Sequence, residues 1–145
     1  MEDIRIIKNK NELEGTCYME ILPGAYKKQC WNDGSLFFEE EVFGYIEPII
    51  ERHVPNYDHY AVTQITKEQW VEIANDLLSL ASLLASVKSV EDLEGKVGFI
   101  FKHSKERFSI DFTSNKKSLS HVAEELSSWG RAKVIEHGSI TILGI

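Results

Sequence analysis

The stretch TKEQWVEIANDLLSLASLLASV, residues 66–87, has the clearest single periodicity in the sequence. Apolar side chains recur there in steps of three and four, the spacing that lines one side of an α-helix. These side chains are Trp70, Ile73, Ala74, Leu77, Leu78, Ala81, Leu84 and Ala85. Thr66 and Gln69 have the spacing of a capping box, and Ile65 before the cap is placed to contact Trp70 as a hydrophobic staple. We therefore expect one long helix over residues 66–87 that forms the scaffold of the domain.

The composition indicates a single acidic domain over residues 1–145. Hydrophobic residues make up 43% of the chain, which is enough for a packed core, and the net charge is −7. Phosphate backbones and anionic lipids repel such a protein, so nucleic-acid and membrane partners are disfavoured and a basic protein partner is favoured. The N-terminus has no signal-peptide pattern and no apolar run has membrane-spanning length, so we expect a cytoplasmic protein.

Strands are expected where apolar and polar residues alternate between turn signals. The segments are residues 3–8, 16–22, 25–31, 35–38, 57–64, 96–102, 107–113 and 139–145. Asn32-Asp33-Gly34 is a strong turn signal because Asp-Gly supplies the positive-φ positions of a tight turn. Residues 96–102 and 107–113 are expected to pair as a hairpin, with a helix over residues 96–105 as the alternative. Residues 89–95 are expected to form a turn or a single helical turn.

Two further helices are predicted, over residues 39–53 and 118–129. Pro48 removes one hydrogen bond from the first of them and crowds the carbonyl of Gly44, so a kink or a break is expected there. Gly130 is expected to end the second helix as its C′ residue. The order of elements predicts an α+β fold, with one mostly antiparallel sheet and about three helices packed on one face.

Acidic residues form the most distinctive surface pattern. Glu68, Glu72 and Asp76 are spaced by four on the long helix, and no Lys or Arg follows four residues later to neutralise them. A solvated helix face is one interpretation, and a docking surface for a basic partner is the other. On the acid-led first helix, Glu40, Glu47 and Glu51 are expected on a similar outward side. The candidate partner-binding residues are Glu39, Glu40, Glu41, Glu47, Glu51, Glu68, Glu72 and Asp76.

Tryptophan residues offer a second binding signal, because exposed aromatic side chains surrounded by acidic residues are typical of hot spots. Trp31 precedes the Asn-Asp-Gly turn and is a candidate for such an exposed position, with a core position as the alternative. Trp70 and Trp129 fall on the apolar faces of their helices and are expected to be structural.

Three stretches together resemble a known group of proteins. They are WNDGSLFFEEEVFGYIEPII at residues 31–50, ITKEQWVEIANDLL at residues 65–78, and SITILGI at residues 139–145. Their order resembles that of the small cytoplasmic immunity proteins of bacterial polymorphic toxin and contact-dependent growth inhibition systems. The resemblance implies a protein without catalytic activity or cofactor that binds and blocks one cognate, often basic, toxin domain. The resemblance does not identify contact residues in this chain, because the interfaces differ from one member of the group to the next.

Two other function classes remain open from the sequence. The first is a metal-dependent hydrolase using His53, Asp58 and His59 with the nearby glutamates, although two histidines six apart across a proline turn match no metal-ligand signature. The second is a small non-catalytic adaptor domain, with the oligomeric state open. Cys17 and Cys30 carry no feature of a nucleophile, and without a secretion signal they are expected to be reduced, partly buried thiols.

Overall fold

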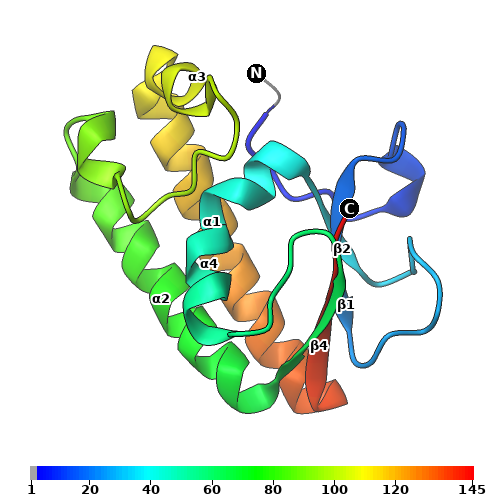
Figure 1. The fold of residues 1–145 in the computed structure, drawn as a ribbon. Coiled ribbons are helices and arrows are strands. Elements are labelled where there is room, and N and C mark those ends of the chain that lie inside the picture. The colour runs from blue at the N-terminus through cyan, green and yellow to red at the C-terminus, as the bar shows by residue number, and fades with distance from the viewer. Residues whose placement is uncertain (1–2) are drawn as a thin grey trace.

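A computed structural model describes residues 3–145 as an antiparallel four-stranded sheet with helices packed on one face (Figure 1). The strand order is β2-β1-β4-β3. The elements are the 3-10 helix η1 (Lys10–Glu12), β1 (Tyr18–Pro23), β2 (Leu36–Glu39), α1 (Glu40–His53), β3 (Val62–Thr66), α2 (Lys67–Ser86), the 3-10 helix η2 (Val90–Leu93), α3 (Ser104–Ile110), α4 (Phe112–His137) and β4 (Ser139–Leu143). The predicted α+β class is confirmed, but the described residues form four α-helices rather than about three. None of these helices combines the length and the apolar character that crossing a membrane requires.

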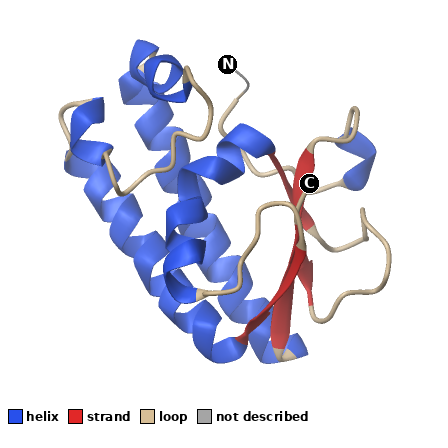
Figure 2. Ribbon diagram, viewed as in Figure 1, coloured by secondary structure: helices blue, strands red, loops and turns tan. Residues whose placement is uncertain are grey.

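Strand β4 lies in the middle of the sheet, although it is the last strand along the chain (Figures 1 and 2). Ile142 is paired with Ile21 of β1 on one side and with Thr63 of β3 on the other. All five residues of β4 are buried, as expected for a strand covered on both faces. The strand predicted at residues 139–145 is therefore confirmed over residues 139–143.

Helix α2 is the long helix predicted at residues 66–87. Its capping box is present: the Gln69 N–H donates to the Thr66 hydroxyl oxygen at 3.1 Å, and the Thr66 N–H donates to the Gln69 side chain at 2.9 Å. The predicted core face needs a correction, because Leu78 and Ala85 are exposed and Leu80 is buried instead. The buried stripe is therefore rotated slightly from the predicted one.

Helix α4 is much longer than the segment predicted at residues 118–129, and Gly130 does not end it. Gly130 lies inside α4, against Trp70 of α2, where a Cβ atom would lie 2.0 Å from the indole ring. The helix ends at Gly138, which has a φ of 80°. The glycine at position 130 thus provides space for a close helix–helix approach and not a left-handed cap. Arg131 and Lys133, which follow this glycine, therefore also lie within α4.

The predicted hairpin of residues 96–102 and 107–113 is wrong, and so is its alternative, a helix over residues 96–105. The chain between η2 and α3 is an irregular loop, followed by α3 and the start of α4. Phe108 is fully buried and packs edge-on against Tyr45 and Phe99, whereas Ile110 is 79% exposed. The two-residue alternation of Phe108, Ile110 and Phe112 therefore does not mark one buried face of a strand. Phe108 and Phe112 are four residues apart, and their rings contact each other edge-on.

Pro48 neither ends α1 nor divides it, since the helix runs unbroken from Glu40 to His53. The loop between η2 and α3 packs on α1 at this point. The Gly98 N–H donates to the Tyr45 carbonyl at 3.0 Å, and a Cβ on Gly98 would lie 2.2 Å from the Gly44 carbonyl oxygen. That carbonyl is the one deprived of its helical donor by Pro48. Because Gly44 and Gly98 have no side chains, the loop backbone packs directly against α1 beside Pro48.

Three predicted strands are shorter than expected or absent. Residues 3–8 form only an isolated bridge between Ile7 and Phe37, although Ile4, Ile6 and Ile7 are buried. Residues 25–31 form no strand. In the expected strand 57–64, regular pairing as β3 begins only at Val62.

The β1–β2 connection is an irregular loop because the buried Glu20 carboxylate organises it. Glu20 accepts hydrogen bonds from the backbone N–H groups of Trp31 and Asn32 and from the Ser35 hydroxyl. Lys28 and Trp31 have positive φ values of 65° and 61°, which a strand does not accommodate. Trp31, the candidate exposed hot spot, is half-buried. In Figure 1 this loop lies on the side of the sheet opposite the helices.

We predict that Gly130→Ala lowers the free energy of unfolding by about 2 kcal/mol, because overpacking a core contact costs about 1–3 kcal/mol. Urea denaturation measures this change, with Ser128→Ala at an exposed site of the same helix as the control. Helix propensity alone would favour alanine by about 1 kcal/mol. Unchanged or increased stability would therefore contradict the importance of the close approach to Trp70.

Candidate functional site

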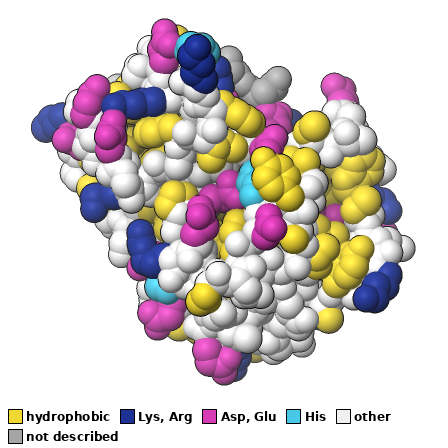
Figure 3. Space-filling view, viewed as in Figure 1, with side chains coloured by type: hydrophobic (Ala, Val, Ile, Leu, Met, Phe, Trp, Pro, Cys, Tyr) yellow, Lys and Arg dark blue, Asp and Glu magenta, His cyan; other side chains and the backbone are white. Residues whose placement is uncertain are grey.

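A cleft of about 580 Å³ opens beside α1. We call it the acidic cleft. Its walls are α1, the loop that leads from α1 to β3, and the loop between η2 and α3. Its lining residues are Glu40, Glu47, Glu51, Pro55, Asn56, Tyr57, Asp58, His59, Tyr60, Ile100 and Phe101. In Figure 3, acidic side chains gather around a histidine near the middle of the face shown, beside a large hydrophobic side chain. The volume lies within the roughly 300–1,000 Å³ usual for ligand sites.

His59 bridges two glutamates of α1. Glu40 and Glu47 are seven residues apart, so they project from the same side of the helix. The Nε2 atom of His59 lies 2.7 Å from a Glu40 oxygen, and its Nδ1 atom lies 2.6 Å from Glu47 Oε2. Carboxylates only accept hydrogen bonds, so both contacts are satisfied together when the imidazole carries two N–H groups. The geometry therefore fits the protonated imidazolium.

The surroundings of His59 favour its charged form. Burial by itself lowers the pKa of His59, but the hydrogen bonds to Glu47 and Glu40 outweigh it and raise the pKa above the usual value. The Tyr57 hydroxyl donates to the same Glu47 oxygen at 2.6 Å. Burial and this bond both raise the pKa of Tyr57, so the tyrosine stays a proton donor. Glu47, only 4% exposed, thus receives two donors.

The last two residues of the described chain form backbone hydrogen bonds with the loop that carries His59. The Gly144 N–H donates to the Ala61 carbonyl at 2.9 Å, and the Ile145 N–H donates to the His59 carbonyl at 3.2 Å. A Cβ on Gly144 would lie 2.2 Å from the His59 carbonyl oxygen, so only glycine allows this approach. The backbone of His59 is therefore attached to the extension of β4 while its side chain is attached to α1.

Tyr60 stands at the mouth of the cleft. Its backbone N–H donates to Asp58 Oδ1 at 2.8 Å, and its ring meets the His59 ring edge-on with centroids 4.8 Å apart. The side chain is nevertheless 72% exposed. Ile100 and Phe101, on the opposite loop, are 38% and 43% exposed. The cleft therefore has an apolar edge on two sides.

The charge of the cleft is negative in either protonation state of its histidine. The cleft is lined by four carboxylates, those of Glu40, Glu47, Glu51 and Asp58. Among its lining residues only His59 can carry a positive charge, since neither Lys nor Arg lines the cleft. Glu51 is exposed and forms no hydrogen bond or ion pair with the described residues. An incoming positive charge would meet unneutralised carboxylates there.

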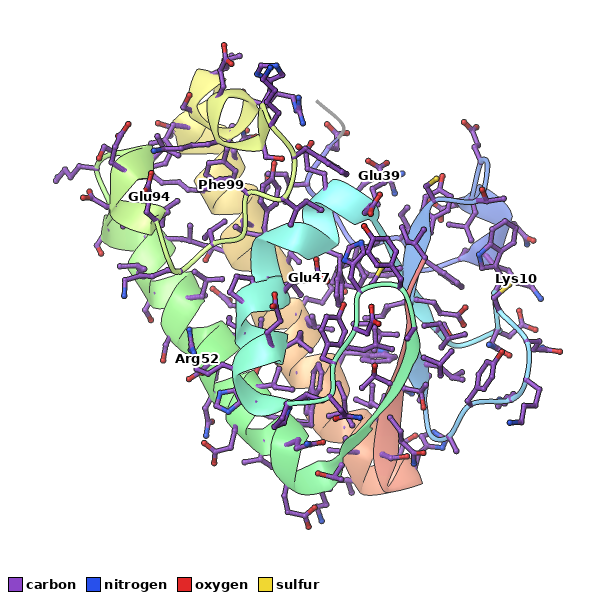
Figure 4. All side chains as sticks on the ribbon, viewed as in Figure 1. Lys10, Glu39, Glu47, Arg52, Glu94 and Phe99 are labelled. Carbon is purple, nitrogen blue, oxygen red and sulfur yellow. The ribbon has the colours of Figure 1, made fainter. Side chains whose placement is uncertain are left out.

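The candidate acidic residues of α1 do not form one outward face. Glu47 is buried and Glu40 is bound to His59, so the expectation that they point outward is wrong for Glu47 (Figure 4). Glu41 is bound by Arg107 and by the Ser104 hydroxyl. Burial would raise the pKa of Glu41, but these two donors hold it below its usual value. Glu39, expected in the first helix, is instead the last residue of β2, and it also has an interaction within the chain.

The ridge predicted on α2 is partly neutralised from another helix. Asp76 accepts hydrogen bonds from Arg52 at 2.7 Å and His53 at 2.6 Å, both on α1. Burial would raise the pKa of Asp76, but these partners outweigh it and lower the pKa. Counting four residues along α2 cannot find partners that lie across a helix interface. Glu68 and Glu72 are exposed, as expected.

The residues of the hydrolase hypothesis are divided between two clusters. His53 contacts Asp76 on the α2 side of α1, where Figure 4 also shows Arg52, whereas His59 lies in the acidic cleft. Within residues 3–145, no group of three or more His, Cys, Asp or Glu side chains is arranged to hold a metal ion. Cys17 and Cys30 are free and exposed, so the expected partial burial is wrong.

Sequence reasoning missed the apolar edge of the cleft. Tyr57 and Tyr60 were expected in a strand, and Ile100 and Phe101 in a hairpin or helix. The available signals were the Val-Pro-Asn turn at residues 54–56, which delays β3, and Gly98, which lets the second loop approach α1.

No protein-family model, curated protein or solved structure matches this chain.

We predict that the stabilisation contributed by His59 is lost as the pH rises. Because folding raises the pKa of His59 above its unfolded value of about 6.5, the contribution is complete below about pH 6.5 and disappears as the pH passes the folded pKa. His59→Gln should therefore cost about 2 kcal/mol near pH 5.5, where hydrogen bonds to charged groups are lost, and much less near pH 9.

Urea denaturation of both proteins across this pH range measures the difference. His121→Gln, at an exposed histidine of α4, is the control. A difference between wild type and His59→Gln that stays constant or grows with pH would contradict the charged bridge.

Proposed function

We propose that this chain is an immunity protein that binds and neutralises a cognate toxin domain in the bacterial cytoplasm, without catalysis of its own. The observation that carries the proposal is the combination, in one cleft, of uncompensated carboxylates with the exposed side chains of Tyr60, Ile100 and Phe101. Aromatic anchors within a polar rim are characteristic of protein–protein hot spots. The resemblance at residues 31–50, 65–78 and 139–145 supports the same conclusion.

The charge of the chain suits such a role. A net charge of −7 attracts basic proteins over a distance, which raises the association rate and disfavours acidic competitors. A toxin that acts on a polyanionic substrate presents a cationic surface around its active site. A cleft rimmed by carboxylates would cover that surface and exclude the substrate.

The cleft is also held in one shape before a partner arrives. The His59 bridge fixes one wall to α1, and the contact of Gly98 with Gly44 fixes the other. Preformed binding surfaces lose less conformational entropy on association, which increases affinity. We therefore assign the principal docking surface to the acidic cleft, with Glu51 as its free carboxylate. Glu68 and Glu72 on α2 form a separate candidate surface.

The test is co-expression of the chain with toxin domains encoded next to its own gene. Wild-type protein should restore growth of toxin-expressing cells and bind the purified toxin domain. We predict that Glu51→Lys weakens this binding by about tenfold or more, equivalent to about 1.4 kcal/mol, and that the loss shrinks at high salt.

Glu72→Lys is the matched control, since it makes the same charge change at an exposed site of α2. A larger loss for Glu72→Lys would move the interface to α2. Failure of the wild-type protein to bind or neutralise any of these toxin domains would overturn the proposed function.

A further inference from the structure

We infer that the acidic cleft receives an arginine side chain from a segment of its protein partner, with Tyr60 as the surface on which the guanidinium stacks. This inference rests on the proposed function, because it specifies which chemical group of the partner enters the site. It is derived from the apolar edge, the charge balance and the free acceptor atoms of the cleft.

The apolar edge indicates that the occupant is a protein segment and not a fully hydrated small cation. Ile100 and Phe101 are kept at the surface because the loop before them is fixed to α1. Gly98 donates to the Tyr45 carbonyl, and Ile100 lies so close to Gly44 that a Cβ there would be 2.7 Å from its side chain. These side chains are therefore available to cover apolar groups that flank a charged residue.

The charge balance selects a positive group. His59 is a cationic partner for Glu40 and Glu47 inside the cleft, whereas the carboxylates at the mouth have no cationic partner among the described residues. Glu51 makes no hydrogen bond or ion pair within the described chain. Asp58 uses Oδ1 for the Tyr60 N–H, and no described residue donates to its Oδ2. An apolar or acidic side chain placed here would desolvate these carboxylates without donating to them, and a neutral polar side chain would leave their charge uncompensated.

The geometry of an arginine side chain fits this set of groups. A guanidinium is planar, stacks on aromatic rings and donates several hydrogen bonds in a fixed fork to carboxylates. Tyr60 offers a ring that His59 contacts on one side and that is otherwise largely exposed. An ammonium group is more strongly hydrated and cannot stack as a plane, so lysine suits the site less well.

Nuclear magnetic resonance titration with a short peptide tests this inference without the toxin. The probe is acetyl-Leu-Arg-Leu-amide, and the matched control peptide carries citrulline, which has the shape of arginine without its charge. We expect amide shifts at Glu51, Asp58, Tyr60 and Phe101, with citrulline binding at least tenfold more weakly. Glu51→Gln and Tyr60→Leu should each weaken binding several-fold, whereas Glu124→Gln, at an exposed site of α4, should not.

Four results would overturn the inference: no shifts around the cleft at 20 mM peptide, shifts confined to another surface, equal binding of the citrulline peptide, or unchanged binding by Tyr60→Leu. Spermidine, titrated separately, would overturn the assignment to a protein segment if it bound the same residues more tightly. The proposed function is judged apart, by toxin neutralisation. A protein that neutralises a toxin but does not bind the arginine peptide would refute this inference alone.

Discussion

The pairing of β4 between β1 and β3 is the constraint on which both the sheet and the acidic cleft depend. β4 supplies hydrogen bonds to two neighbours, and the residues just after it supply two more to the loop that carries His59. The partners of β4 in β1 lie more than a hundred residues earlier, as in the pair of Ile21 with Ile142. Closing so long a loop costs conformational entropy, and contacts of such sequence separation slow folding. The backbone of the loop that carries His59 is thus attached to the same strand that completes the sheet.

Close backbone approach at three glycines connects the elements to one another. Gly130 admits Trp70 between α2 and α4, Gly98 lies against the Gly44 carbonyl of α1, and Gly144 lies against the His59 carbonyl. None of the three has the positive φ that usually explains a glycine. Their common property is the missing Cβ atom, which lets a backbone or an aromatic ring come within van der Waals distance. The second contact places the Gly98 backbone against the carbonyl that Pro48 leaves without its helical donor.

Elements with complete local signals were predictable, and elements shaped by distant residues were not. The capping box at Thr66 and the apolar end of the chain are short-range patterns, so α2 and β4 were predicted nearly as they are. Gly130 is indistinguishable in sequence from a helix C′ residue, and only Trp70 of α2 reveals its role. For the same reason the acidic residues were recognised as a group, but the pairing of Asp76 with α1 and the burial of Glu47 were not.

Burial divides the carboxylates of the cleft into two roles. A buried carboxylate such as Glu47 is costly unless a cation and further donors satisfy it, and His59 and Tyr57 provide both. Glu51 and Asp58 lie in contact with water and incur no such cost in the free protein. They lose their hydration only when a partner covers them. A partner that brings no positive group would leave their charge uncompensated, whereas a guanidinium would replace the hydrogen bonds to water that they lose. The same division therefore stabilises the cleft in the free protein and, under the proposed function, would favour a basic partner.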